Sequence, residues 1–212
     1  MKEYHKIETI FERDMDGTKK LIIGKFRNPT IEYLKNCEWV FTEKIDGTNI
    51  RVMWDGHDIT FAGRTDRAEI PKPLMARLEE LFLNDETEQL FEQTFGEKEA
   101  ILYGEGYGGK IQNGTNYKET EDFILFDVEC NGVFYNYLYC VELAEMFGIS
   151  YVPIVTRGTL DLGIKMVTVM SSLMGETAKF EGFVARPIVE LKDNRGNRII
   201  VKIKVRDFEG IV

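Results

Sequence analysis

Cysteine and histidine are scarce in this chain, which has three cysteines and two histidines among its 212 residues. The cysteines, Cys37, Cys130 and Cys140, are odd in number and form no C-x-x-C pair. The sequence therefore predicts neither a disulfide framework nor a zinc site, favours a reducing compartment, and leaves the cysteines as small buried hydrophobes. The histidines, His5 and His57, are too isolated to suggest a metal site or a catalytic triad.

Long apolar runs are also missing. No run is long enough to span a bilayer, and residues 1–5 do not read as a signal peptide, so we expect a cytoplasmic protein that does not associate with membranes. The net charge of −9 argues against broad, non-specific binding to nucleic acid, which depends on a basic surface. The net charge does not exclude a local basic groove, and Lys202, Lys204 and Arg206 form one such cluster at every second position.

Apolar and alternating runs predict more strands than helices. We therefore expect an α+β fold with mainly antiparallel sheets, in a single domain over residues 1–212. Hairpin turns are expected at 54–57, where Asp55 precedes Gly56, and at 193–197. Met166, Val169, Met170 and Leu173 are expected to face inward on the last predicted helix. The predicted strands are 21–24, 39–43, 49–54, 59–62, 100–105, 123–128, 182–186 and 199–205, and the predicted helices are 74–82, 137–147 and 161–174.

Residues 43–49, with the sequence EKIDGTN, form the most informative segment. Lys44 follows an apolar strand-like run and precedes an Asp46–Gly47 turn. A lysine becomes a nucleophile only when it is deprotonated, which requires desolvation or cationic neighbours, and a strand that enters a turn is a suitable place for it. The alternative is a surface lysine beside a hairpin.

Four further short motifs follow this segment along the chain. Each is weak by itself, but their order and their placement on strands or strand ends are specific. The five motifs are 44–49 (KIDGTN), 103–106 (YGEG), 124–128 (ILFDV), 181–184 (EGFV) and 201–204 (VKIK).

In this order the motifs resemble those of the covalent nucleotidyltransferase superfamily, which contains ATP-dependent RNA ligases, DNA ligases and mRNA capping enzymes. The resemblance runs from about Trp39 to Arg206 and implies a nucleotidyltransferase (ATP-grasp-like) domain of antiparallel sheets flanked by helices. It also implies that Lys44 attacks the α-phosphorus of ATP and carries AMP as a phosphoramidate. Asn49 and Arg64 are similar to residues of the phage RNA ligase 2 type, in which Arg64 would contact the substrate and act in catalysis.

Lys202 and Lys204 lie on the same side of their predicted strand, because strand side chains alternate. They can therefore neutralise one phosphate together and disfavour the charged form of a nearby lysine. The alternative is an exposed edge strand that lysines protect from pairing.

The two glutamates of the motifs, Glu105 and Glu181, lie beside glycines that allow a nucleotide to approach the backbone. The resemblance implies that Glu105 binds a ribose hydroxyl and that Glu181 holds a hydrated Mg²⁺ or Mn²⁺, with Asp46 and Glu105 also near the metal. The alternative for either glutamate is an exposed, solvated side chain, and the alternative for Asp46 is a turn residue before Gly47. Phe126 is expected to stack on adenine, with ordinary core packing as its alternative. The implied nucleotide-binding set is Lys44, Asn49, Arg64, Glu105, Phe126, Glu181, Lys202 and Lys204.

The chain is thus expected to be an RNA ligase that joins an RNA 5′-phosphate to a 3′-hydroxyl through a lysine–AMP intermediate. Family ligases usually carry a second domain, and too few residues flank the motifs here for one, so an accessory domain or partner is a possible requirement. Two other readings remain open: a DNA ligase or GTP-using capping enzyme, and a nucleotide- or RNA-binding module without turnover.

Overall fold

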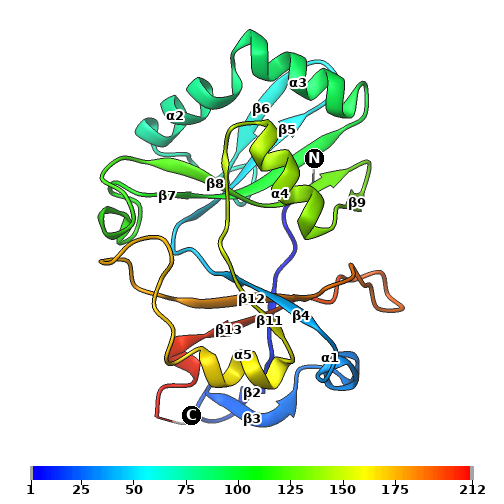
Figure 1. Ribbon diagram of the computed structural model, residues 1–212, viewed down its shortest axis with the longest axis vertical. Coiled ribbons are helices and arrows are strands. Elements are labelled where there is room, and N and C mark those ends of the chain that lie inside the picture. Colours follow the sequence, from blue (N-terminus) through cyan, green and yellow to red (C-terminus); the bar gives the residue numbers. More distant parts are fainter. Residues whose placement is uncertain (1, 211–212) are drawn as a thin grey trace. The chain divides into compact units, whose positions relative to one another are not determined.

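The computed structural model describes residues 2–210, and within them the chain forms two compact units (Figure 1). The first unit comprises residues 2–5 and 45–152, and the second comprises residues 6–44 and 153–210. Each unit has its own hydrophobic core. The interpretation of the chain as one functional domain stays a prediction.

The first unit is built on a six-stranded sheet. Its strand order is β10–β8–β7–β5–β6, with β9 paired to β8, and all neighbours are antiparallel except β10 and β8. Because most strands are joined by antiparallel pairing, the sheet matches the expected α+β class. The strands are β5 (Thr48–Trp54), β6 (Ile59–Ala62), β7 (Ala100–Tyr107), β8 (Asp122–Cys130), β9 (Val133–Phe134) and β10 (Ser150–Tyr151).

Three helices contribute side chains to the core of this unit, together with the strands. They are α2 (Lys72–Phe82), α3 (Asp85–Phe95) and α4 (Tyr137–Met146). The stripe Leu74, Leu78 and Phe82 of α2 is fully buried against the strand residues that point to the same side. Burial of a side chain such as Phe82 stabilises the fold by about 1.5–3 kcal/mol. Since side chains alternate along a strand, every second residue of each strand lies on the opposite face of the sheet, away from these helices.

The second unit contains a five-stranded sheet of order β1–β13–β12–β4–β11 and a two-stranded sheet of β2 and β3. Only β1 and β13 pair in parallel. Its strands are β1 (Glu8–Thr9), β2 (Phe11–Arg13), β3 (Leu21–Phe26), β4 (Trp39–Glu43), β11 (Ile154–Gly158), β12 (Gly182–Pro187) and β13 (Val201–Lys204), and its helices are α1 (Pro29–Leu34) and α5 (Leu160–Met166).

The structure confirms all eight predicted strands, with ends shifted by up to two residues, and two of the three predicted helices. Both hairpin turns are also present: β5 pairs with β6, and Lys192 pairs with Arg198. The third helix is shorter than the predicted range 161–174, because α5 ends at Met166. Beyond it, Val169 and Leu173 are 76% and 56% exposed instead of buried, while Met166 and Met170 do pack on the core of the second unit.

Helices α1 and α3 and the short strands β1, β2, β9, β10 and β11 were not predicted. Helix α3 is rich in acidic residues, so its apolar stripe is narrow: only Thr87, Phe91 and Phe95 are buried. Cys130 and Cys140 are buried as expected, but Cys37 is exposed.

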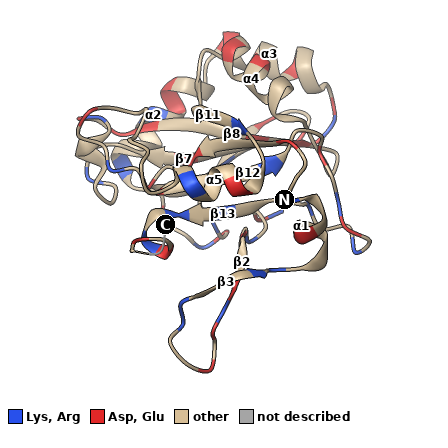
Figure 2. Cartoon of the chain, turned by 60° about the horizontal axis from the view of Figure 1, so that its bottom comes forward, with Lys and Arg blue, Asp and Glu red and all other residues tan. Residues whose placement is uncertain are grey.

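Acidic and basic residues are interspersed along both units, and the acidic ones on α3 stand out in Figure 2. Within residues 2–210, no helix combines the length and the apolar character that crossing a bilayer requires.

Candidate functional site

The central motif residue of the second unit is Lys44, which directly follows the fully buried strand β4. Its backbone N–H donates a hydrogen bond to the carbonyl oxygen of Gly182 at 2.9 Å. Gly182 has φ +140°, and a Cβ there would lie 2.1 Å from the carbonyl oxygen of Ile203. Only glycine therefore lets β4, β12 and β13 approach one another at this point.

Strand β12 lies between β4 and β13, so the residue before it can meet side chains from both neighbours. That residue is Glu181. Its Oε2 lies 2.5 Å from Nζ of Lys44, and its Oε1 accepts a hydrogen bond from Nζ of Lys204. The three side chains are 14–25% exposed. One half-buried carboxylate thus joins the two lysines that the motifs place far apart in the sequence.

The charges around Glu181 are strongly coupled. Burial works to raise the pKa of the Glu181 carboxyl, but the ammonium groups of Lys44 and Lys204 outweigh it and hold that pKa below its ordinary value. The pKa of Lys202 is lowered, first by burial and then by repulsion from Lys204 and Lys44. Two lysines therefore contact one glutamate, and Lys202 feels the charge of both lysines. The excess of positive charge suits a bound polyanion such as a triphosphate.

The edge-strand interpretation of Lys202 and Lys204 does not hold. Strand β13 pairs with β1 on one side and with β12 on the other, so it lies inside the sheet. Lysines on an interior strand cannot serve to protect an unpaired edge. Lys202 and Lys204 share one face of this strand, as the alternation predicted.

Glu43, the residue before Lys44, was missed by sequence reasoning. It is 1% exposed, and its carboxylate accepts hydrogen bonds from the Ser172 hydroxyl at 2.5 Å and from the Leu173 N–H at 2.8 Å. A buried carboxylate is retained only when it is hydrogen-bonded in this way. It ties the segment after α5 to the end of β4, directly beside Lys44. The sequence signal that could have identified Glu43 is an acidic residue at the end of an apolar run.

In the first unit, the sheet face opposite the helices carries the polar motif residues. Asn49 of β5 lies directly opposite Glu105 of β7, and two residues further along Arg51 lies opposite Tyr103. Residues at alternate positions of paired strands point to the same face, so these four side chains share one surface. The register therefore brings together two predicted site residues, Asn49 and Glu105.

The turn that precedes this face is closely packed. A Cβ on Gly47 would lie 2.3 Å from the carbonyl oxygen of Gly106 and 2.8 Å from Cγ of Glu105. The Asp46 N–H donates to the Tyr117 hydroxyl at 3.4 Å. Glycine at position 47 lets the turn lie against β7 beside Glu105, which explains the pairing of these two motifs.

Phe126 occupies a special backbone position. The pairing of β7 with β8 is regular up to Tyr103 and Asp127 and then shifts, so that Gly104 lies opposite Leu125 and Phe126 is the extra residue of a β-bulge. Bulges re-aim a side chain. Phe126 is half-buried, and its ring meets the ring of Tyr4 edge-on with 5.0 Å between centroids. The Tyr4 hydroxyl donates to the buried carboxylate of Asp127 at 2.7 Å.

The side-chain amide oxygen of Asn49 is a buried acceptor without a donor in the described residues. A buried acceptor left without a donor costs about 1–3 kcal/mol. A donor group on a ligand would satisfy this atom, so the residue fits a binding role.

Arg64 is exposed and lies in the loop after β6, outside the strands that carry Asn49 and Glu105. The predicted metal set also divides: Glu181 belongs to the second unit, and Asp46 and Glu105 belong to the first. Among residues 2–210 no three His, Cys, Asp or Glu side chains form a metal-binding group. Mg²⁺ needs only one or two carboxylates when phosphates and retained water complete its shell. Both oxygens of Glu181 bind lysines, so this carboxylate would hold such an ion only after Lys44 has moved away. The metal ligands stay a prediction.

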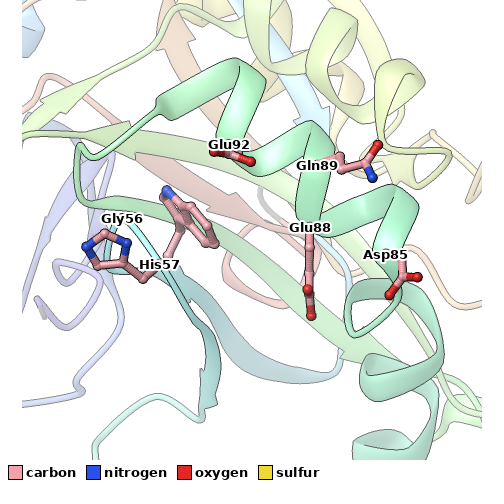
Figure 3. Close-up of a pocket in the computed structure, with 7 residues that line it drawn as sticks. Gly56, His57, Asp85, Glu88, Gln89 and Glu92 are labelled. Atoms are coloured by element: carbon pink, nitrogen blue, oxygen red, sulfur yellow. The ribbon is translucent and has the colours of Figure 1, made fainter.

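A cavity of about 350 Å³ lies elsewhere in the first unit, between α3 and the β5–β6 turn (Figure 3). None of the predicted site residues lines it. The lining residues are Trp54, Gly56, His57, Asp85, Glu88, Gln89 and Glu92. Their acidic character does not suit a nucleotide phosphate.

Comparison with known proteins gives two findings. The model of the RNA ligase family matches residues 37–204, which is most of the chain. The fold is similar to structures of Naegleria gruberi RNA ligase at 20% sequence identity. An alanine variant with ATP and Mn gives a TM-score of 0.69 and covers 100% of this chain and 58% of that one. The complex of the same ligase with PPi gives a TM-score of 0.65 and covers 85% of this chain and 53% of that one.

These structures are longer than the present chain, which spans little more than half of their length. At 20% identity they demonstrate a common fold. The family match rests on the sequence itself and extends from just before β4 to the end of β13, so it contains every motif described above. The chain belongs to the RNA ligase family.

Proposed function

We propose that this chain is an ATP-dependent RNA ligase whose nucleophile is Lys44. The observation that carries the proposal is the arrangement of Lys44, Glu181 and Lys204, in which one carboxylate holds two lysines from separate strands. A buried ion pair is weak evidence for a stabilising role, because its desolvation cost can exceed its Coulomb gain. The arrangement does suit a lysine that must be held in one place and then released to react.

In the first step, the Lys44 amine attacks the α-phosphorus of ATP, forms a P–N bond and displaces pyrophosphate. The Lys44 ammonium must leave Glu181 and pass a proton to water, because only the neutral amine is nucleophilic. Lys202 and Lys204 bind the phosphate oxygens and stabilise the negative charge that grows on them in the transition state. A bound Mg²⁺ or Mn²⁺, which Glu181 would hold with retained water, supplies further charge neutralisation.

The polar face of the first unit carries the residues proposed to bind ribose and adenine. Glu105 accepts a hydrogen bond from a ribose hydroxyl, and Phe126, re-aimed by the bulge, stacks on adenine. Asn49 has a buried acceptor that a ligand donor can satisfy. Asp46 and Glu105 carry carboxylates that would suit a divalent ion. The related Naegleria gruberi structures include complexes with ATP and Mn and with PPi, which supports this choice of nucleotide and ion.

In the second and third steps, AMP passes from Lys44 to an RNA 5′-phosphate, and a 3′-hydroxyl then attacks that phosphate and releases AMP. Arg64, exposed in its loop, contacts the RNA strand. We further propose a cytoplasmic location, and that sealing involves an accessory domain or partner protein.

The test is the intact mass of the protein after incubation with ATP and Mg²⁺, followed by peptide mapping. We expect one AMP on Lys44 and none in the Lys44→Ala variant. An AMP adduct that persists in Lys44→Ala would contradict the assignment of the nucleophile. A GMP adduct formed in preference to AMP would identify a capping enzyme, and binding of ATP without any adduct would identify a module without turnover.

A further inference from the structure

Arg51 of β5 is a fully buried arginine that the motifs do not include. Its Nε donates a hydrogen bond to the carbonyl oxygen of Gly63 at 2.9 Å, and its terminal NH2 group donates to Oδ1 of Asp66 at 2.6 Å. A guanidinium without access to water must be paired, so these contacts are held strongly. Both partners belong to the short loop that follows β6.

The loop itself is compact. Gly63 is buried, and a Cβ there would lie 2.8 Å from Cβ of Ala68. The Ala68 N–H donates to the carbonyl oxygen of Thr65 at 3.1 Å, which closes a tight turn. Arg64 lies between the two points, 63 and 66, at which Arg51 holds the loop, and it is exposed to solvent. The loop therefore presents Arg64 from a fixed backbone.

The carboxylate of Asp66 helps to hold the loop through its contact with Arg51. Its side chain is 77% exposed, and the hydrogen bond and the charge of Arg51 lower its pKa. A solvent-exposed carboxylate gains little from an ordinary surface ion pair. Here its partner is buried, so the contact orders the exposed residue and not the reverse.

We propose that Arg51 is a positioning residue that acts through the loop: it clamps Gly63 and Asp66 and so fixes Arg64 for contact with the RNA strand. Arg51 and Asn49 are two positions apart on β5 and share one face. The clamp thus connects Arg64 to the strand that carries Asn49. Groups that must contact a ligand are effective when rigid elements hold them in place. This inference rests on the proposed function of Arg64.

The clamp can be tested without any measurement of activity. Trypsin cleaves after Arg64 and Arg67 only when the loop opens, since proteolysis follows the population of the open form. We expect Arg51→Met, which leaves the loop sequence unchanged, to increase cleavage at these two bonds by about tenfold relative to the wild type, the scale of a local opening made easier by loss of a charged hydrogen bond. Unchanged cleavage at both bonds would overturn the clamp.

The link to catalysis is tested with Asp66→Asn, an exposed change that should alter Tm by less than about 3 °C. Using pre-adenylylated protein and a nicked duplex, we expect sealing to slow by about tenfold, because a small misplacement of a substrate-binding group is costly. Formation of Lys44–AMP from ATP should stay within about twofold of the wild type. The matched control is Asp161→Asn, which removes an exposed carboxylate from a 2.6 Å ion pair with Lys165 and should change nothing.

A double-mutant cycle separates positioning from general stability. If Asp66 acts through Arg64, then Asp66→Asn should have no further effect on sealing in an Arg64→Ala background. Effects that simply add, or an equal loss of adenylylation and sealing, would overturn the proposal. A wild-type protein that forms no lysine–AMP would contradict the proposed function instead, and the trypsin measurement would still decide whether the clamp exists.

Discussion

The side-chain nitrogen of Lys44 lies 2.5 Å from a carboxylate oxygen of Glu181, a residue 137 positions further along the chain. The other oxygen of that carboxylate binds Lys204. The contact brings together the first, fourth and fifth motifs, and it exists because β12 lies between β4 and β13.

Lys202 should matter for catalysis but not for folding. Its pKa is lowered by burial and by the charges of Lys204 and Lys44, so removal of its charge relieves repulsion. We expect Lys202→Met to slow adenylylation by about 10²-fold, the scale for loss of one electrostatic stabiliser, while Tm stays the same or rises. Single-turnover labelling with ATP and thermal unfolding measure the two effects. Lys165→Met, on the exposed side of α5, is the control; a parallel fall in Tm and rate for Lys202→Met would favour a structural role.

Glu181 should make stability depend on acid pH. Its folded pKa lies below the ordinary value of 4.5, so its contribution to stability is fully present above about pH 4.5 and is lost as the pH falls through the folded pKa. We expect Glu181→Gln to lower Tm at neutral pH, and the difference from the wild type to shrink below pH 4.5 because the wild-type carboxyl then also becomes neutral. Glu145→Gln, an exposed change, should give a difference that does not vary with pH. A constant gap for Glu181→Gln would refute the coupling.

Gly104 should tolerate no side chain. A Cβ there would lie 2.2 Å from two ring carbons of Phe123 and 2.5 Å from the carbonyl oxygen of Ile124. Phe123 is 1% exposed and packs against Phe82, so it cannot move aside. We expect Gly104→Ala to reduce the free energy of unfolding by about 1–3 kcal/mol, the usual cost of overpacking a core. Denaturant titration is the measurement.

The control for that change is Gly17→Ala, where the added Cβ would meet only the carboxylate end of the half-buried Asp14 side chain. This variant should stay within about 0.5 kcal/mol of the wild type, as surface substitutions usually do. Equal stability of Gly104→Ala and the wild type would mean that the bulge region can relax, which the close packing of β7 on β8 argues against.

The nucleic acid should be RNA on the 3′-hydroxyl side of the break. With matched nicked duplexes, we expect faster sealing when the 3′-hydroxyl terminus is RNA than when it is DNA. Because the chain carries a net charge of −9, few phosphates are neutralised, and the rate of sealing should fall with added salt with a shallow slope. Adenylylation of Lys44 should depend less on salt. Faster sealing of an all-DNA nick would support a DNA ligase.

The strands that carry the motifs could be predicted from the sequence alone. Alternation predicted that Lys202 and Lys204 share a face, and apolar runs located β4, β5, β6, β7, β8, β12 and β13 to within two residues. These features are local, since they depend on the two-residue period of a strand and on turn residues such as Asp55 and Gly56. The order of the motifs then sufficed to indicate the family, because order needs no knowledge of spatial contacts.

Which polar residues are buried, and what they bind, could not be predicted from local patterns because it depends on the folded chain. Glu43 reaches Ser172, and Arg51 reaches Asp66, through contacts that depend on how loops fold back onto strands. The exposure of Val169 and Leu173 likewise follows from the early end of α5, although their helical spacing suggested a buried stripe. Periodicity states which residues share a face of an element, but whether that face is covered depends on packing between segments distant in sequence.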